Sequence, residues 1–98
     1  MVFIGLDLSL VATGFCEIRD DGNVSGIGTI GSRGKDGARL LSITNAVMER
    51  LRRVEVGVIA IEALGFGAFP YTIAKLAELH GAIKLSLAIA EINPPIYV

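Results

Sequence analysis

Two acidic residues lie at the ends of apolar segments, where a carboxylate is unfavourable unless something balances its charge. Asp7 interrupts the stretch FIGLDLSLVATG at 3–14, and Glu62 ends the apolar run VGVIAIE at 56–62. Removing an ionised carboxylate from water costs on the order of several kcal/mol unless it is paired, protonated or bound to a metal ion. These two acids are therefore the first candidates for chemistry in the sequence.

The two acids meet if their segments are neighbouring parallel strands. With 2–8 and 56–62 joined through a helix at 38–53, both carboxylates emerge at the carboxyl edge of the sheet, where sites of open α/β sheets form. Two close carboxylates repel unless a cation lies between them, and oxygen ligands suit Mg²⁺ or Mn²⁺. A pair of such ions activates water and stabilises the leaving oxygen in phosphodiester cleavage. The spacing leaves a simpler reading open, in which each carboxylate caps a loop amide.

The apolar pattern predicts one α/β domain over 1–98 with the element order β-β-β-α-β-α-β. Three antiparallel strands form a meander with a DDGN turn at 20–23, and parallel strands follow, with helices on the sheet faces. The predicted strands cover 2–8, 14–19, 24–30 and 56–62, with a last one starting at 96–98, and the predicted helices cover 38–53 and 71–91.

The helix at 71–91 carries two apolar stripes. The first contains Leu76, Leu79, Ile83, Leu87 and Ala90, and the second contains Ala77, Leu85, Ala88 and Ile89. One stripe is expected to cover the sheet. The other needs a further partner, either another helix or a second subunit.

Composition excludes several classes of protein. The chain is 52% hydrophobic with a net charge of −1, so it is neither disordered nor a nucleic-acid binder through its overall charge. It contains no apolar run of membrane-spanning length and no secretory signal pattern. The lone Cys16 excludes an internal disulfide, and His80 has no second histidine or cysteine at ligand spacing. These features fit a reducing, cytoplasmic setting.

Basic residues form two clusters, which are either solvated charges or contacts for phosphate groups. The first contains Arg33, Lys35 and Arg39, and the second contains Arg50, Arg52 and Arg53.

Three segments resemble the RuvC-type Holliday junction resolvases of the ribonuclease H-like superfamily. IGLDLSLVATGFCEI resembles their first strand and hairpin, and VIAIEALGFG resembles their fourth strand with its catalytic glutamate. AKLAELHGAIKLSLAIAEINPPIYV is similar to their next helix and strand, closest to phage-type members. The resemblance covers about 2–98 and implies a ribonuclease H-like fold, a role in DNA recombination and repair, and Mg²⁺ or Mn²⁺ as cofactor.

The resemblance also implies roles for the two acids. Asp7 would bridge both metal ions, and Glu62 would bind one of them. The family has two further acids on a C-terminal helix, which this sequence lacks, since its last acid, Glu91, lies inside the helix at 71–91. We therefore expect an incomplete metal site, weak metal binding and little or no cleavage by these 98 residues.

Further residues are candidate DNA contacts. The family places an aromatic residue after the glutamate to push against unpaired bases, and Phe66 and Phe69 are the candidates here, offset by about one residue from the family pattern. In the alternative interpretation, either ring packs between the helix and the sheet. Ser9 and Thr13 either steady Asp7 or a phosphate, or satisfy turn amides. The candidate phosphate contacts are Arg33, Lys35 and Arg39.

The leading hypothesis is the N-terminal part of a metal-dependent endonuclease that acts on branched DNA as a homodimer through the 71–91 helix. One alternative is an ATPase half of the actin and sugar-kinase superfamily, which shares the element order. Its phosphate-binding turn is disfavoured here because no second glycine follows Asp7 directly. Another alternative is a non-catalytic, nucleic-acid-binding relative.

Overall fold

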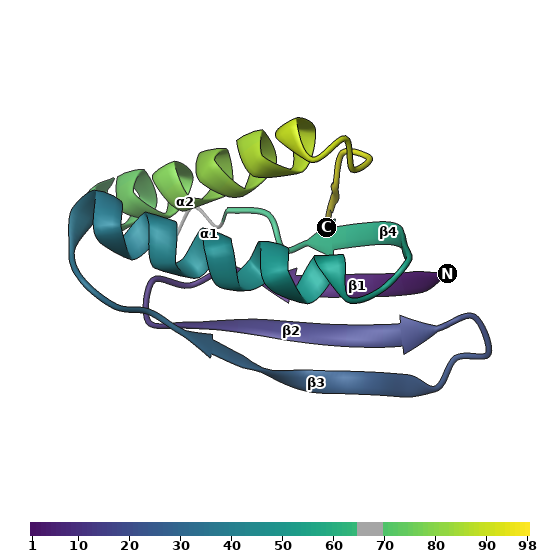
Figure 1. Cartoon of the computed structure of the whole chain (residues 1–98). Coiled ribbons are helices and arrows are strands. Elements are labelled where there is room, and N and C mark those ends of the chain that lie inside the picture. The colour runs from purple at the N-terminus through teal and green to yellow at the C-terminus, as the bar shows by residue number, and fades with distance from the viewer. Residues whose placement is uncertain (65–69) are drawn as a thin grey trace.

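A computed structural model describes residues 1–64 and 70–98, which form one sheet and two helices (Figure 1). The strands are β1 (Val2–Asp7), β2 (Ala12–Arg19), β3 (Val24–Gly31), β4 (Val56–Ile61) and β5 (Ile96–Tyr97), and the helices are α1 (Asp36–Arg52) and α2 (Pro70–Ile89).

The sheet is mixed, and its strand order is β3-β2-β1-β4-β5. β2 runs antiparallel to both β1 and β3, whereas β1, β4 and β5 are parallel. The predicted element order and strand directions are confirmed. The chain crosses the sheet twice in the same direction, through α1 and then α2, and right-handed crossovers place both helices on one face. Both helices of the described residues therefore cover the same face of the sheet.

The core lies between the helices and this one face of the sheet. Alternate residues of the central strands point toward the helices, as the period of a strand requires. The side chains with at most 3% exposure include Ile4, Ile59 and Ile61 of the sheet, Ile43, Val47 and Leu51 of α1, and Leu79, Ile83 and Leu87 of α2.

Only one of the two apolar stripes of α2 is covered. Leu79, Ile83 and Leu87 are buried, but Leu85 and Ile89 are 62% and 74% exposed. Ala90 was expected in the buried stripe and is exposed, because α2 ends at Ile89 and the chain turns away through the next residues. The second stripe therefore faces outward in the single chain.

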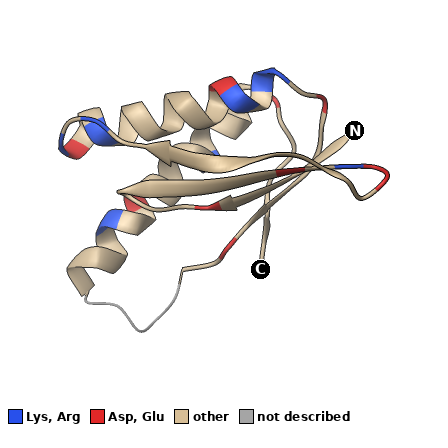
Figure 2. Cartoon of the chain, turned by 90° about the horizontal axis from the view of Figure 1, so that it is seen from below, with Lys and Arg blue, Asp and Glu red and all other residues tan. Residues whose placement is uncertain are grey.

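The charges of α1 gather at its two ends (Figure 2). Asp36 lies in its first turn, and Arg50 and Arg52 lie in its last turn, where basic side chains complement the helix dipole. Neither described helix is long and apolar enough to cross a membrane.

Candidate functional site: a carboxylate pair on the open face of the sheet

The register between β1 and β4 brings Asp7 and Glu62 to matching positions. Leu6 is paired with Ile61 on the adjacent parallel strand. The backbone N–H of Glu62 donates to the carbonyl oxygen of Leu6 at 3.2 Å, so the alignment continues past the end of β4. Asp7 therefore directly follows Leu6, and Glu62 directly follows its cross-strand partner Ile61.

Both carboxylates point to the sheet face that the described helices leave open. Leu6 and Ile61 are buried under the helices, so the residues that follow them point the other way. Asp7 and Glu62 are exposed and line one shallow, largely apolar hollow of about 580 Å³. The structure thus brings the two predicted acids together on one rim and one face.

Gly14 keeps the space beside Asp7 open. It is the cross-strand partner of Asp7 on β2, and a Cβ atom built at residue 14 would lie 3.5 Å from the Asp7 Cβ. That is an ordinary van der Waals contact, so an alanine fits, whereas a longer side chain would extend across the carboxylate. The partly buried Cys16, two residues further along β2, lines the same hollow.

The turn after Asp7 is held by two hydroxyl groups. Thr13 Oγ1 donates to the Ser9 carbonyl oxygen at 2.9 Å and accepts from the Ser9 N–H at 3.2 Å. Ser9 Oγ accepts from the backbone N–H of Val11 at 3.2 Å. The Thr13 side chain is fully buried, so it is unsuited to touch a phosphate directly. These are the bonds of a turn that fixes the end of β1, and Ser9, which is half-buried, remains a candidate DNA contact.

The two carboxylates are the right kind of ligand for a hard cation, but they are few. Two carboxylates are suitable oxygen ligands for Mg²⁺ or Mn²⁺. No group of three or more His, Cys, Asp or Glu gathers anywhere in residues 1–64 and 70–98. Glu91 lines a different hollow with Val54 and Val56, at the far end of β4 from Glu62. The described residues thus offer two candidate ligands for a divalent cation.

The predicted phosphate contacts do not form one patch. Lys35 and Arg39 line a cavity of about 270 Å³ where the first turns of α1 and α2 meet. Arg33 lies outside it, in a separate groove along β3. Lys75, which is not among the residues predicted from the sequence, lines the cavity with Lys35 and Arg39.

Lys75 is held between the two helices. Its Nζ lies 3.7 Å from both Asp36 Oδ1 and Glu78 Oε1. The spacing of Lys75 and Glu78 is a helical i,i+3 pair that the sequence does contain, whereas the contact with Asp36 depends on how α1 and α2 pack.

His80 packs beside the end of the chain rather than among other ligands. Its ring stacks on Tyr97 of β5 with centroids 6.2 Å apart. Burial lowers the pKa of His80 below its ordinary value of 6.5. Next to this contact, the N–H of Ala63 donates to the Val98 carbonyl oxygen at 2.8 Å, which ties the segment after Glu62 to the end of β5.

The predicted aromatic contacts Phe66 and Phe69 lie outside the described residues.

Comparison with known proteins relates this chain to the RuvC proteins. No protein-family model matches the sequence. The crossover junction endodeoxyribonuclease RuvC of Neorickettsia sennetsu is 33% identical over 94 residues, an alignment that covers 90% of this chain and 57% of that protein.

Solved structures give the same result for the fold. Thermus thermophilus RuvC in complex with a Holliday junction substrate superposes on the whole chain with a TM-score of 0.85 at 19% identity, and a second T. thermophilus RuvC structure does so with a TM-score of 0.81 at 20%. The chain spans 64% and 63% of those two chains, so it matches less than two thirds of each relative. Over its own length, the chain is homologous to RuvC and has the ribonuclease H-like fold of RuvC.

Proposed function

We propose that the chain is the N-terminal part of a divalent-metal-dependent endonuclease that acts on Holliday junctions or other branched DNA, in the cytoplasm of a bacterial or phage-infected cell. The observation that carries this proposal is the pair Asp7 and Glu62, which follow paired residues on adjacent parallel strands and line one hollow. Homology to a crossover junction endodeoxyribonuclease supports it and disfavours an ATPase half.

In this proposal Asp7 and Glu62 are the residues that hold Mg²⁺ or Mn²⁺. A divalent ion at such a site supplies charge stabilisation and a lowered pKa for water during phosphodiester hydrolysis. The chain itself contributes two anionic groups at the ends of adjacent strands and a turn held by Ser9 and Thr13. Because the described residues bring only these two carboxylates together, we expect cation binding with little cleavage.

DNA contacts at other residues are part of the same proposal. Lys35 and Arg39 would bind backbone phosphates with Lys75, which shares their cavity. Phe66 and Phe69 would contact unpaired bases at the branch, and each stacking contact contributes about 1–3 kcal/mol in single-strand binding. Phe66→Ala should then weaken junction binding more than duplex binding.

The proposal is tested by comparing affinities for a four-way junction and for a linear duplex made of the same arms. Fluorescence anisotropy at one fixed salt concentration should give tighter binding to the junction, and Mn²⁺ should increase this preference in the native chain but not in Asp7→Asn. Glu55→Gln is the matched control, since Glu55 is an exposed acid outside the hollow. Equal affinity for both DNAs, with no effect of Mn²⁺, would refute the proposal, and junction preference without any cation effect would favour a non-catalytic DNA-binding relative.

We further propose that the protein forms a homodimer through α2. The exposed stripe supports this, since Leu85 and Ile89 are large apolar side chains with 62% and 74% exposure. Leu85→Asp combined with Ile89→Asp should convert a dimer to a monomer in light scattering. A native chain that is monomeric at high concentration would contradict this part.

A further inference from the structure

A groove between the edge strand β3 and helix α1 carries the basic cluster that the proposed catalytic site does not use. It has a volume of about 470 Å³, and its lining includes Arg33, Arg50, Arg53 and Glu49. The groove lies on the helix side of the sheet, whereas Asp7 and Glu62 face the open side. The two places therefore lie on opposite faces of the sheet, and Thr29 of the edge strand β3 lines both.

The groove lies between the end of β3 and the last turns of α1. Thr29, Ile30 and Gly31 line it from the strand, and Glu49 and Arg50 line it from the helix. Ile30 is the buried side chain of β3. The charged groups of the groove therefore come from the end of α1 and from the segments that follow β3 and α1.

Arg50 is fixed at the groove without a carboxylate partner among the described residues. Its guanidinium carbon lies 4.5 Å from the centroid of the Phe15 ring, a cation–π contact that orients the charged group. Arg53 Nη2 is instead 3.0 Å from Glu49 Oε1, in a pair whose two side chains are 63% and 65% exposed. Three arginines against one glutamate leave the groove with an excess of positive charge.

One hydroxyl group adds a neutral donor to the arginines of the groove. Ser42 Oγ accepts from the backbone N–H of Arg33 at 3.1 Å, which leaves its own proton to donate. Ser32 also lines the groove, but its Oγ donates to the Leu10 carbonyl oxygen at 2.7 Å, so Ser42 is the hydroxyl with a free proton. Arginine forks combined with hydroxyl donors match the tetrahedral oxygens of a phosphate better than they match a single carboxylate.

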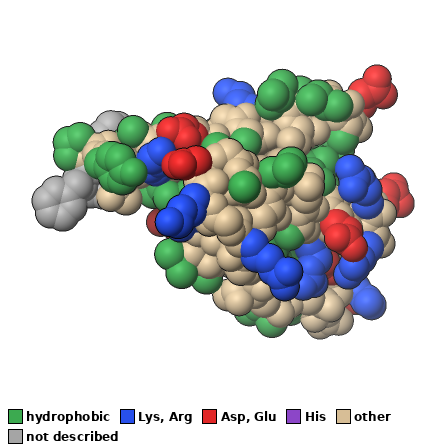
Figure 3. Space-filling model, turned by 60° about the vertical axis from the view of Figure 1, so that its left-hand side comes forward, with side chains coloured by type: hydrophobic (Ala, Val, Ile, Leu, Met, Phe, Trp, Pro, Cys, Tyr) green, Lys and Arg blue, Asp and Glu red, His purple; other side chains and the backbone are tan. Residues whose placement is uncertain are grey.

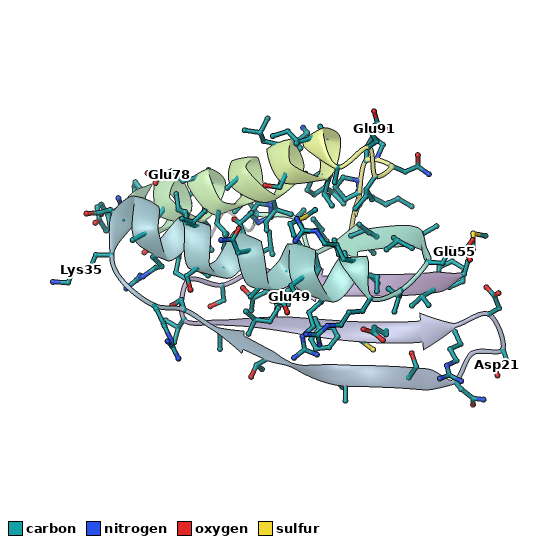
Figure 4. All side chains as sticks on the ribbon, in the orientation of Figure 1. Asp21, Lys35, Glu49, Glu55, Glu78 and Glu91 are labelled. Carbon is teal, nitrogen blue, oxygen red and sulfur yellow. The ribbon has the colours of Figure 1, made fainter. Side chains whose placement is uncertain are left out.

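We propose that the groove between β3 and α1 binds backbone phosphates of a nucleic-acid duplex outside the Asp7–Glu62 site. The charge pattern favours a nucleic acid, since the basic groups lie along one open groove rather than in a closed cavity. Figure 3 shows Lys and Arg side chains gathered around an acidic one on this side of the molecule, and Figure 4 labels Glu49 on α1 above the strands. The proposal rests on the proposed function only in taking the nucleic acid to be DNA.

The test compares two double variants of equal charge in the complete chain. Arg33→Gln with Arg53→Gln removes two exposed arginines from the groove, and Arg19→Gln with Arg52→Gln removes two exposed arginines that do not line it. Affinity for a short fluorescent duplex is measured by anisotropy over a range of salt concentrations. The groove variant should bind several-fold more weakly, and its log–log salt slope should fall by up to about 2, since each phosphate that an arginine neutralises contributes about 0.9 to the slope and Arg53 is partly neutralised by Glu49. The control should keep the native slope.

A third variant should change duplex affinity in the opposite direction. Glu49→Gln removes the acid from the groove and frees Arg53, so it should tighten duplex binding and steepen the salt dependence. Equally weakened binding in the two double variants, or no measurable duplex binding by the native chain at low salt, would overturn the proposal. Circular dichroism of each variant confirms the fold.

Experiments can refute the proposed metal site and the proposed groove independently of each other. Asp7→Asn should remove Mn²⁺ binding and leave duplex binding in the groove unchanged, whereas the groove variant should do the reverse. Loss of duplex binding in the groove variant of a chain that binds no Mn²⁺ would support the groove and refute the proposed nuclease site.

Discussion

Asp7 and Glu62, separated in the sequence by the β2–β3 hairpin and by helix α1, directly follow the paired residues Leu6 and Ile61 on adjacent parallel strands. The N–H of Glu62 donates to the carbonyl oxygen of Leu6 at 3.2 Å, so backbone hydrogen bonding sets the relative position of the two acids. Side-chain packing on the far face, under the helices, then fixes which way they point.

A cation at this pair should stabilise the fold. The free energy of unfolding of the native chain should rise with Mg²⁺, by about 1.4 kcal/mol when the free ion reaches roughly ten times its dissociation constant. Asp7→Asn should abolish this increase and change the metal-free stability little, because Asp7 is exposed. Urea unfolding with and without Mg²⁺ measures both, and Glu55→Gln should behave as the native chain. An undiminished Mg²⁺ effect in Asp7→Asn would place the ion elsewhere.

The hydroxyl of Thr13 should contribute more to the free energy of unfolding than the hydroxyl of an exposed threonine. Thr13→Val leaves the Ser9 N–H and carbonyl without their partner, so it should lower the free energy of unfolding by about 1–3 kcal/mol. Thr29→Val, at an exposed position on β3, is the control and should change it by less than about 0.5 kcal/mol. Equal effects in denaturant unfolding would mean that the turn does not depend on this hydroxyl.

Shortening an apolar side chain to alanine on the buried side of α2 should destabilise the chain more than the same change on the exposed side. Ile83→Ala removes a side chain with 0% exposure and should cost about 2–5 kcal/mol. Leu85→Ala, at 62% exposure, should cost less than about 0.5 kcal/mol in a monomeric sample. Thermal or urea unfolding at low protein concentration makes the comparison. Similar costs would contradict the orientation of the helix.

His80 should make stability depend on pH just below neutrality. Burial lowers its pKa in the folded chain below the ordinary value of 6.5, so the unfolded chain binds more protons in the interval between the two values. The free energy of unfolding should therefore rise with pH through this interval and level off above about 6.5. It should fall when acid protonates the partly buried ring. His80→Gln should flatten this rise in unfolding curves taken between about pH 5.5 and 7.5. A variant with the same pH profile as the native chain would contradict the burial effect.

The sequence allowed the element order and the meeting of the two acids to be predicted because both depend on local pattern. An apolar run of strand length that ends on an acid is visible in VGVIAIE, and parallel strands align their carboxyl ends. The strands also ended close to the predicted residues, so Asp7 closes β1 and Glu62 comes just after β4.

Features that depend on how the elements pack together could not be predicted from the sequence. The placement of both helices on one face follows from the handedness of two crossovers, and the contact of Lys75 with Asp36 joins two helices. The groove at Arg33, Arg50 and Arg53 joins residues of β3 and α1 that the sequence shows as two separate clusters. The buried state of Thr13 likewise reflects the tight turn after β1, not its residue type.

The most direct measurement of the central claim is the paramagnetic effect of Mn²⁺ on the amide NMR spectrum of the chain. Substoichiometric Mn²⁺ should broaden the signals of Asp7, Gly14 and Glu62 first, and Asp7→Asn should remove this selective broadening. Broadening centred on other residues, or a pattern that persists unchanged in Asp7→Asn, would contradict the claim that these two carboxylates hold a divalent cation.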